Sequence, residues 1–221
     1  MDLVGDKWTL LIVRDLAAGP RRFVELQRVL PGISTEQLRS RLNRMVADGM
    51  LTRKRYREVP PRVDYELTDR ARELMPILGE LARWGYEWAW SPPREQERVD
   101  LGAIFRLAPG LMHTSRSTRG RVEFVVSDRE QGGGAASYVL AASGGGVTIE
   151  EHPAPDADAH VEGTVDAWVL ALSPEGDRGE LKVSGDAKLA DEMLNGLALS
   201  EHRAVSTSGA GSAPGPASAA A

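Results

Sequence analysis

Cysteine is absent from all 221 residues of the sequence. Disulfide bonds, zinc–thiolate centres and thiol-based redox sensing are therefore excluded for this chain. The sequence also lacks an apolar run of the roughly 18 to 20 residues that cross a bilayer, and its first residues lack the charged and then apolar pattern of a signal peptide. These absences predict a cytoplasmic protein with no membrane contact.

The signatures of the common catalytic sites are missing too. The sequence has no P-loop, no Gly-x-Gly-x-x-Gly and no nucleophile elbow, and its glycine runs are typical of turns. Residues 150–160 place His152 and His160 among carboxylates, but their spacing fits no standard zinc signature, so an acidic, solvated loop is the simpler interpretation. We expect a protein that is not an enzyme and that holds no metal and no cofactor.

Charge is unevenly distributed along the chain. The formal net charge is −5, yet residues 1–98 carry 18 Lys and Arg against 15 Asp and Glu, whereas residues 99–221 carry 9 against 17. Residues 21–62 alone carry 11 basic and 4 acidic side chains. A polyanion such as DNA would therefore meet the chain within this segment.

Hydrophobic periodicity predicts short helices followed by a hairpin in the first part of the chain. Apolar residues recur at three- and four-residue steps, and proline–glycine turns separate the resulting segments. Ser34 and Gln37 have the spacing of a capping box, and Thr68 is placed to cap a further helix. The predicted helices span about residues 3–16, 22–30, 34–48 and 68–90, and the hairpin pairs residues 51–56 with 63–67.

Beyond residue 98 the pattern changes to β-prone runs that glycine-rich turns separate. The expected elements are a helix at 99–112, strands at 121–127, 137–142, 147–151 and 160–164, a helix at 165–172, a strand at 181–184 and a helix at 187–199. The end of the chain is nearly all Ser, Gly, Ala and Pro, and such a segment cannot bury enough apolar surface to offset its ordering entropy.

The predicted fold class is α+β, in two domains. A winged helix-turn-helix domain over residues 1–92 precedes a linker at 93–98 and a small α+β domain at 99–200, whose mixed sheet is covered by helices. Residues 204–221 are expected to be disordered.

The third predicted helix carries side chains that suit a DNA groove. In a helix-turn-helix its counterpart enters the major groove, where Gln pairs with adenine and Arg with guanine. We expect Gln37, Ser40 and Arg41 nearest the bases, and Arg44 on a phosphate. The complete predicted set of DNA contacts is Arg21, Arg22, Ser34, Thr35, Gln37, Ser40, Arg41, Arg44, Arg55, Arg57 and Arg62.

The members of this set that lie outside the third helix are predicted to contact DNA on other grounds. Arg21 and Arg22 begin the second helix, where backbone N–H groups and the helix dipole favour an anion. Arg55 and Arg57 lie along the hairpin, and Arg62 lies at its proline-stiffened tip, which suits a narrow minor groove. The alternative is that all these charges are simply the solvated faces of a small helical domain.

Residues 1 to about 90 resemble the HxlR family of MarR-like winged-helix regulators. The resemblance rests on the segments LVGDKWTLLIVRDL, GPRRFVELQRVLPGIS, LRSRLNRMVADGMLTRKRYREVPPRVDYELT and ELARWG. It implies a homodimer that binds pseudo-palindromic operators in double-stranded DNA. The aromatic cluster Trp84, Tyr86, Trp88 and Trp90 would then belong to the dimer interface, although packing inside one subunit is an equally weighted alternative.

Residues 99–199 resemble, more weakly, the sterol carrier protein type of lipid-binding domain, through the order of elements and the segment LKVSGDAKLADEMLNGL. The resemblance implies a pocket for a small apolar ligand. Its candidate lining residues are Leu101, Ile104, Phe105, Leu111, Met112, Trp168, Met193 and Leu194. The competing interpretation is that they are ordinary core residues.

The sequence therefore predicts a dimeric transcriptional regulator, expected to be a repressor, whose second domain senses a ligand. A lipid carrier or sequestering protein, whose winged domain makes only protein contacts, is the alternative.

Overall fold

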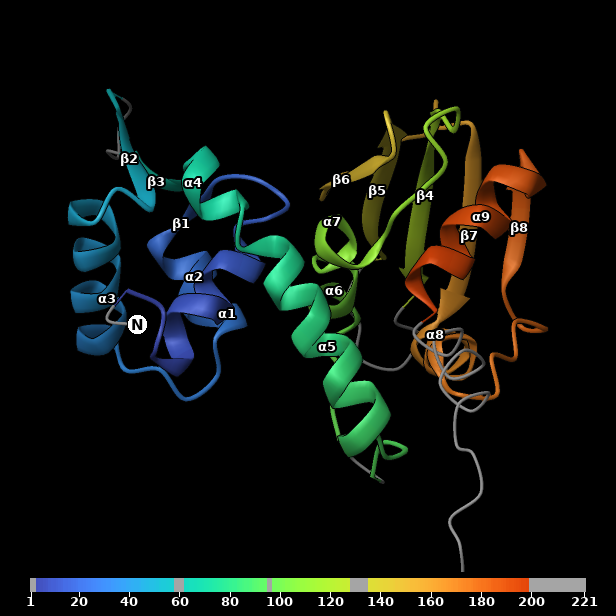
Figure 1. Ribbon diagram of the computed structural model, residues 1–221, viewed down its shortest axis with the longest axis horizontal. Coiled ribbons are helices and arrows are strands. Elements are labelled where there is room, and N and C mark those ends of the chain that lie inside the picture. The colour runs from blue at the N-terminus through green and yellow to red at the C-terminus, as the bar shows by residue number, and fades with distance from the viewer. Residues whose placement is uncertain (1–2, 58–61, 95–96, 128–134, 199–221) are drawn as a thin grey trace, which may run out of the picture.

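The computed structural model describes residues 3–57, 62–94, 97–127 and 135–198. The predicted disordered tail, 204–221, lies outside these ranges. Two hydrophobic cores are present, one under the first half of the chain and one under the second, and the two halves lie side by side (Figure 1). The structure confirms the α+β class, with a winged helix-turn-helix followed by a domain with a five-stranded mixed sheet. None of the described helices is long and apolar enough to span a membrane.

The first domain is built from three short helices and a three-stranded antiparallel sheet. The helices are α1 (Lys7–Asp15), α2 (Phe23–Val29) and α3 (Thr35–Ala47). The strands are β1 (Arg21–Arg22), β2 (Leu51–Tyr56) and β3 (Arg62–Leu67), in the order β1-β3-β2. Sequence periodicity did not predict β1, because a two-residue strand is defined only by its distant partner in β3.

Helix α1 begins later than predicted. The carboxylate of Asp6 accepts hydrogen bonds from the backbone N–H groups of Trp8 and Thr9, at 2.9 and 3.1 Å, which satisfies donors that have no partner inside the helix. Residues 3–5 therefore precede the helix, although their apolar spacing continues its stripe.

Two predicted long helices are each interrupted, for the same reason. The helix expected over 68–90 consists of α4 (Asp69–Arg72) and α5 (Met75–Ala89), and the helix expected over 99–112 consists of α6 (Leu101–Phe105) and α7 (Ala108–Leu111). In α5 and α7 a proline, Pro76 or Pro109, occupies the first turn. Proline fits there because it lacks an N–H, but its ring opposes continuation of a helix from the preceding side.

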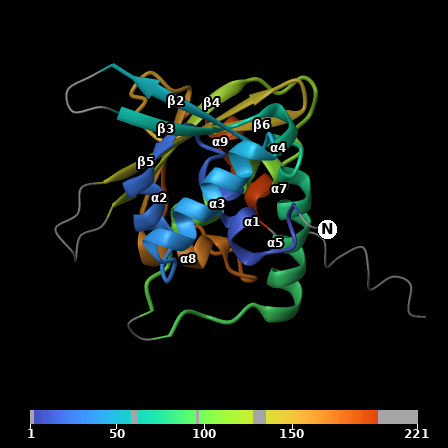
Figure 2. The same ribbon diagram turned by 90° about the vertical axis from the view of Figure 1, so that its left-hand side faces the viewer.

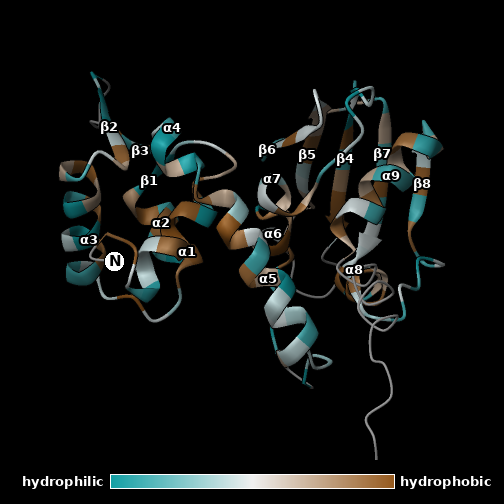
Figure 3. Cartoon of the chain, viewed as in Figure 1, coloured by the Kyte–Doolittle hydropathy of each residue, from teal (hydrophilic) through white to brown (hydrophobic). Residues whose placement is uncertain are grey.

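The second domain is a five-stranded sheet covered by helices on one face (Figure 1). Strand order is β6-β5-β4-β7-β8; β4 and β7 are parallel and the other pairs are antiparallel. The strands are β4 (Gly120–Ser127), β5 (Ala136–Ser143), β6 (Gly146–Glu150), β7 (Ala159–Thr164) and β8 (Lys182–Gly185), and the remaining helices are α8 (Val165–Leu172) and α9 (Ala187–Leu197). Apolar colouring concentrates between the sheet and its helices (Figure 3).

Helix α5 joins the two domains. Its buried side packs against α7 through Gly79 and Gly110. A Cβ atom at Gly79 would collide with the backbone carbonyl group of Gly110, so the two helices cross here with no side chain between them. Arg83 of α5 also donates a hydrogen bond to the carbonyl oxygen of Leu111. The two domains are thus held together by backbone-to-backbone packing as well as by side chains.

Candidate nucleic-acid interface

Helix α3 lies on the side of the first domain that faces away from the second domain (Figure 1). A view from that side shows α3 in front, below the strands β2 and β3 (Figure 2). The helix starts as predicted: the Ser34 hydroxyl accepts from the Gln37 N–H, and the Ser34 N–H donates to Gln37 Oε1, each at 3.1 Å. Leu38, Leu42 and Met45 are buried, which turns the polar positions outward.

Most of the α3 residues chosen from the sequence are exposed. Ser34, Thr35, Gln37, Ser40 and Arg44 all lie on the outer face. Arg41 differs, because its guanidinium lies 3.0 Å from the Asp6 carboxylate at the start of α1 and its side chain is only 24% exposed. Arg41 therefore links two helices of the domain.

The hairpin presents its basic residues on an exposed strand. From Thr52 onward β2 is exposed, and Arg55 and Arg57 are both on the surface. Arg62 pairs with Asp64 at 2.6 Å and lies over the ring of Tyr56. The hairpin tip, residues 58–61, is outside the described ranges.

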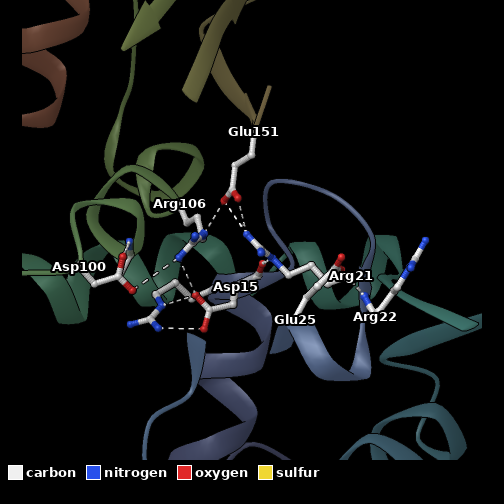
Figure 4. Close-up of polar contacts among 9 residues, drawn as sticks. Asp15, Arg21, Arg22, Glu25, Asp100, Arg106 and Glu151 are labelled. Atoms are coloured by element: carbon white, nitrogen blue, oxygen red, sulfur yellow. Dashed lines mark hydrogen bonds and ion pairs between the residues drawn. The ribbon is translucent and has the colours of Figure 1, made fainter. Parts of the chain in front are cut away.

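Arg21 and Arg22 point in opposite directions, as successive strand residues do. Arg22 is the N-cap of α2, and its side chain is 48% exposed, 4.0 Å from Asp64. Arg21 turns toward the second domain, where it donates to both carboxylate oxygens of Glu151 at 2.6 Å and to the backbone carbonyl of Asp15 at 2.7 Å (Figure 4). The two arginines predicted as a phosphate-binding pair thus serve different surfaces.

An ionic cluster that sequence analysis missed surrounds Arg21. Arg106, from the end of α6, is 5% exposed and contacts the carboxylates of Glu151 at 2.5 Å and Asp15 at 3.2 Å (Figure 4). Asp15 is fully buried and also pairs with Arg14 at 2.9 Å. The sequence did contain a signal for this cluster, because Asp15 and Arg106 are each a charged residue at the end of a largely apolar helical segment.

The eight residues proposed to line an apolar pocket belong to the core of the second domain. Seven are buried and Ile104 packs against them. The ring of Phe105 lies 5.0 Å from Trp168 and 5.5 Å from Phe124, measured between centroids. This packing matches the interpretation of these residues as core, and the pocket stays a prediction.

The two histidines near the acidic loop have carboxylate partners. His160 Nδ1 lies 3.0 Å from Glu123 Oε2 and His152 Nε2 lies 2.6 Å from Glu150 Oε2. Among the described residues no group of three or more His, Asp or Glu side chains could hold a metal ion.

The chain resembles known proteins over its first domain. Residues 3–92 match the HxlR-like helix-turn-helix family. The HTH-type transcriptional regulator sll1512 of Synechocystis is 42% identical over 104 residues, which are 47% of this chain and 73% of that protein. The HTH-type regulator BH0655 of Halalkalibacterium halodurans is 46% identical over 86 residues, 38% of this chain and 76% of that protein. A solved structure of a MarR-family regulator from Porphyromonas gingivalis W83 is 40% identical, with a TM-score of 0.39, over 40% of this chain and 86% of that chain.

An outward-facing α3 beside an exposed hairpin places the protein among winged helix-turn-helix transcriptional regulators. The chain belongs to the HxlR family. The family match ends at residue 92, so it does not identify the second domain.

Proposed function

We propose that this regulator acts as a homodimer on pseudo-palindromic operators and represses transcription. The observation that carries DNA binding is the position of α3, whose polar face is exposed and uncovered by the second domain (Figure 2). Of the predicted contacts, the proposed DNA surface keeps Arg22, Ser34, Thr35, Gln37, Ser40, Arg44, Arg55, Arg57 and Arg62. Arg21 and Arg41 are assigned instead to contacts within the subunit, with Glu151 and Asp6.

A stripe along α5 supports the dimer. Ile77, Leu81, Trp84 and Trp88 follow one another at steps of four, three and four residues, which places them on one helix face. They are 53, 49, 63 and 70% exposed, so Trp84 and Trp88 are not packed inside the subunit. A second copy would cover an apolar surface of a kind that monomeric proteins rarely expose.

DNA binding is tested by fluorescence anisotropy with the chain's own upstream region and a random duplex of equal length. We expect preference for the upstream region and steep salt dependence, because phosphate contacts release counterions. Arg22→Ala should weaken both duplexes alike, whereas Arg116→Ala, an exposed arginine of the second domain, should change neither. Equal affinity for both duplexes at moderate salt would contradict a specific regulator.

The dimer is tested by sedimentation velocity of the full chain. Leu81→Glu combined with Trp84→Glu should shift a dimer to monomer, and Glu87→Gln on the same helix should not. A monomer in the unsubstituted protein would contradict the proposal. The alternative of a lipid carrier gains no support, since its candidate lining residues pack against one another.

A further inference from the structure

A groove of about 850 Å³ lies where the two domains meet. Figures 1 and 2 both show α4, α7 and β6 around this junction. The size suits a drug-sized molecule, and sites of this kind favour domain interfaces. Its lining residues are Ala17, Ala18, Gly19, Pro20, Asp69, Arg72, Glu73, Met75, Pro76, Pro109, Thr148, Ile149, Glu150, Glu151 and His152.

The floor of the groove is apolar and comes from both domains. Ala17 and Met75 of the first domain and Ile149 of the second are buried, at 8, 4 and 4% exposure. Pro20 and Pro109 are further apolar residues of the lining. A ligand with a hydrocarbon or aromatic body would gain free energy here by removing apolar surface from water.

The rim of the groove is acidic. Four carboxylates line it against two basic side chains, Arg72 and His152. Some of this charge is already compensated, because Glu151 binds Arg21, and Glu150 contacts His152. Two carboxylates therefore remain to be accounted for.

These two are Asp69 and Glu73, which lie four residues apart at α4. Residues at this spacing are neighbours on a helix surface, where two like charges repel one another. Both are exposed, and neither has a cationic partner among the described residues. Arg72 lies between these two residues in the sequence, but its guanidinium is 4.0 Å from the Glu66 carboxylate. A cation placed between Asp69 and Glu73 would relieve their repulsion.

We infer that the groove binds an organic cation with an apolar body. The protonated amine lies between Asp69 and Glu73, and the body lies on Ala17, Met75 and Ile149. Such a ligand contacts both domains at once. Its role as an effector rests on the proposed function, but its binding does not, so binding is tested without DNA.

The test compares three probes that share one body: 4-phenylbutylamine, 4-phenylbutanol and 4-phenylbutyrate, titrated into the full chain by calorimetry. We expect the amine to bind up to about fivefold more tightly than the alcohol, as one weak surface ion pair would give, and the carboxylate to bind least. The advantage of the amine should shrink as salt is raised. Equal binding of amine and alcohol would overturn the inference.

Two variants locate the site. Asp69→Asn with Glu73→Gln should remove the preference for the amine, whereas Glu162→Gln with Asp166→Asn, an equal change of charge on the far strand and helix, should keep it. Thr148→Trp should block all three probes by filling the groove, with circular dichroism confirming the fold. Undiminished amine binding in either groove variant would overturn the assignment, while loss of DNA binding would leave it untouched.

Discussion

Two arginines of α3 illustrate how the surroundings of a residue decide its role. Arg41 is held by Asp6, whose pKa is lowered: burial alone would raise it, but hydrogen bonds from Thr9 and Trp8 and the charge of Arg41 outweigh burial. Arg44 is 59% exposed, and the Asp48 carboxylate lies 3.8 Å from its guanidinium. Its side chain can therefore turn to a phosphate at little cost.

We predict that Arg44→Ala weakens binding to specific and random duplexes alike and reduces the slope of log affinity against log salt by about 1, because one phosphate contact is lost. The free energy of unfolding of this variant should stay within about 0.5 kcal/mol of the value for the unsubstituted protein. Arg41→Ala should instead lower the free energy of unfolding, by up to about 1 kcal/mol. Anisotropy and urea unfolding measure the two effects, and an unchanged salt slope for Arg44→Ala would contradict its assignment.

Glu123 makes stability depend on pH. It is a buried carboxylate on β4, and burial raises its pKa, but hydrogen bonds from Ser137, the Ala154 backbone and His160 outweigh this and lower the pKa below its usual range. A carboxylate with a lowered pKa in the folded state contributes stability above the pKa of the unfolded chain. That contribution is lost as pH falls through the folded value.

We predict that Glu123→Gln lowers the free energy of unfolding at pH 7 by about 1 to 3 kcal/mol, the value of hydrogen bonds to a charged group. The difference from the unsubstituted protein should shrink as pH falls below about 4. Urea unfolding between pH 3 and pH 7.5 measures it, with the exposed Glu162→Gln as control. A difference that is constant over this range would contradict the assignment.

At the scale of elements, the crossing of α5 and α7 depends on the absence of side chains. Gly79→Ala should gain up to about 1 kcal/mol from helix propensity but lose more, because the new methyl group would meet the Gly110 backbone. We predict a net loss of about 2 kcal/mol or more in thermal or urea unfolding. Gly85→Ala, in the same helix with nothing within 4 Å of the new carbon, should instead stabilise the protein. Equal effects of the two substitutions would show that the crossing is not tight.

The elements also show what the sequence could reveal. Local signals succeed: the Ser34 and Gln37 capping box starts α3 where predicted, and strands with alternating burial such as β6 were located to within a residue or two. Local signals fail where a proline interrupts an apolar stripe, as at Pro76 and Pro109, because periodicity does not register a missing N–H. They also fail for Arg21, whose partner Glu151 is 130 residues away in the chain.

At the scale of the whole molecule, ion pairs between the two domains supply part of the attraction that an apolar interface would otherwise provide. Arg106 is desolvated, and burial alone would lower its pKa, but Glu151, Asp15 and Asp100 outweigh this and raise it, so it stays charged. The cluster joins the end of α1 to α6 and to the residue after β6. The pairs Arg21–Glu151 and Arg106–Asp15 cross the boundary, so they persist only while both domains keep their present positions.

We predict that Arg106→Met lowers the free energy of unfolding by about 1.5 to 3 kcal/mol, because Asp15 and Glu151 lose charged hydrogen bonds although Arg14 and Arg21 still pair with them. Hydrogen exchange should accelerate in α1 and α7, on both sides of the boundary, and stay unchanged in β8 at the far edge of the sheet. Arg178→Met is the control, because Arg178 pairs with Asp191 at 3.0 Å within one domain, and an exposed pair is worth about 1 kcal/mol or less. If exchange accelerates in the second domain alone, Arg106 stabilises that domain and does not hold the two together.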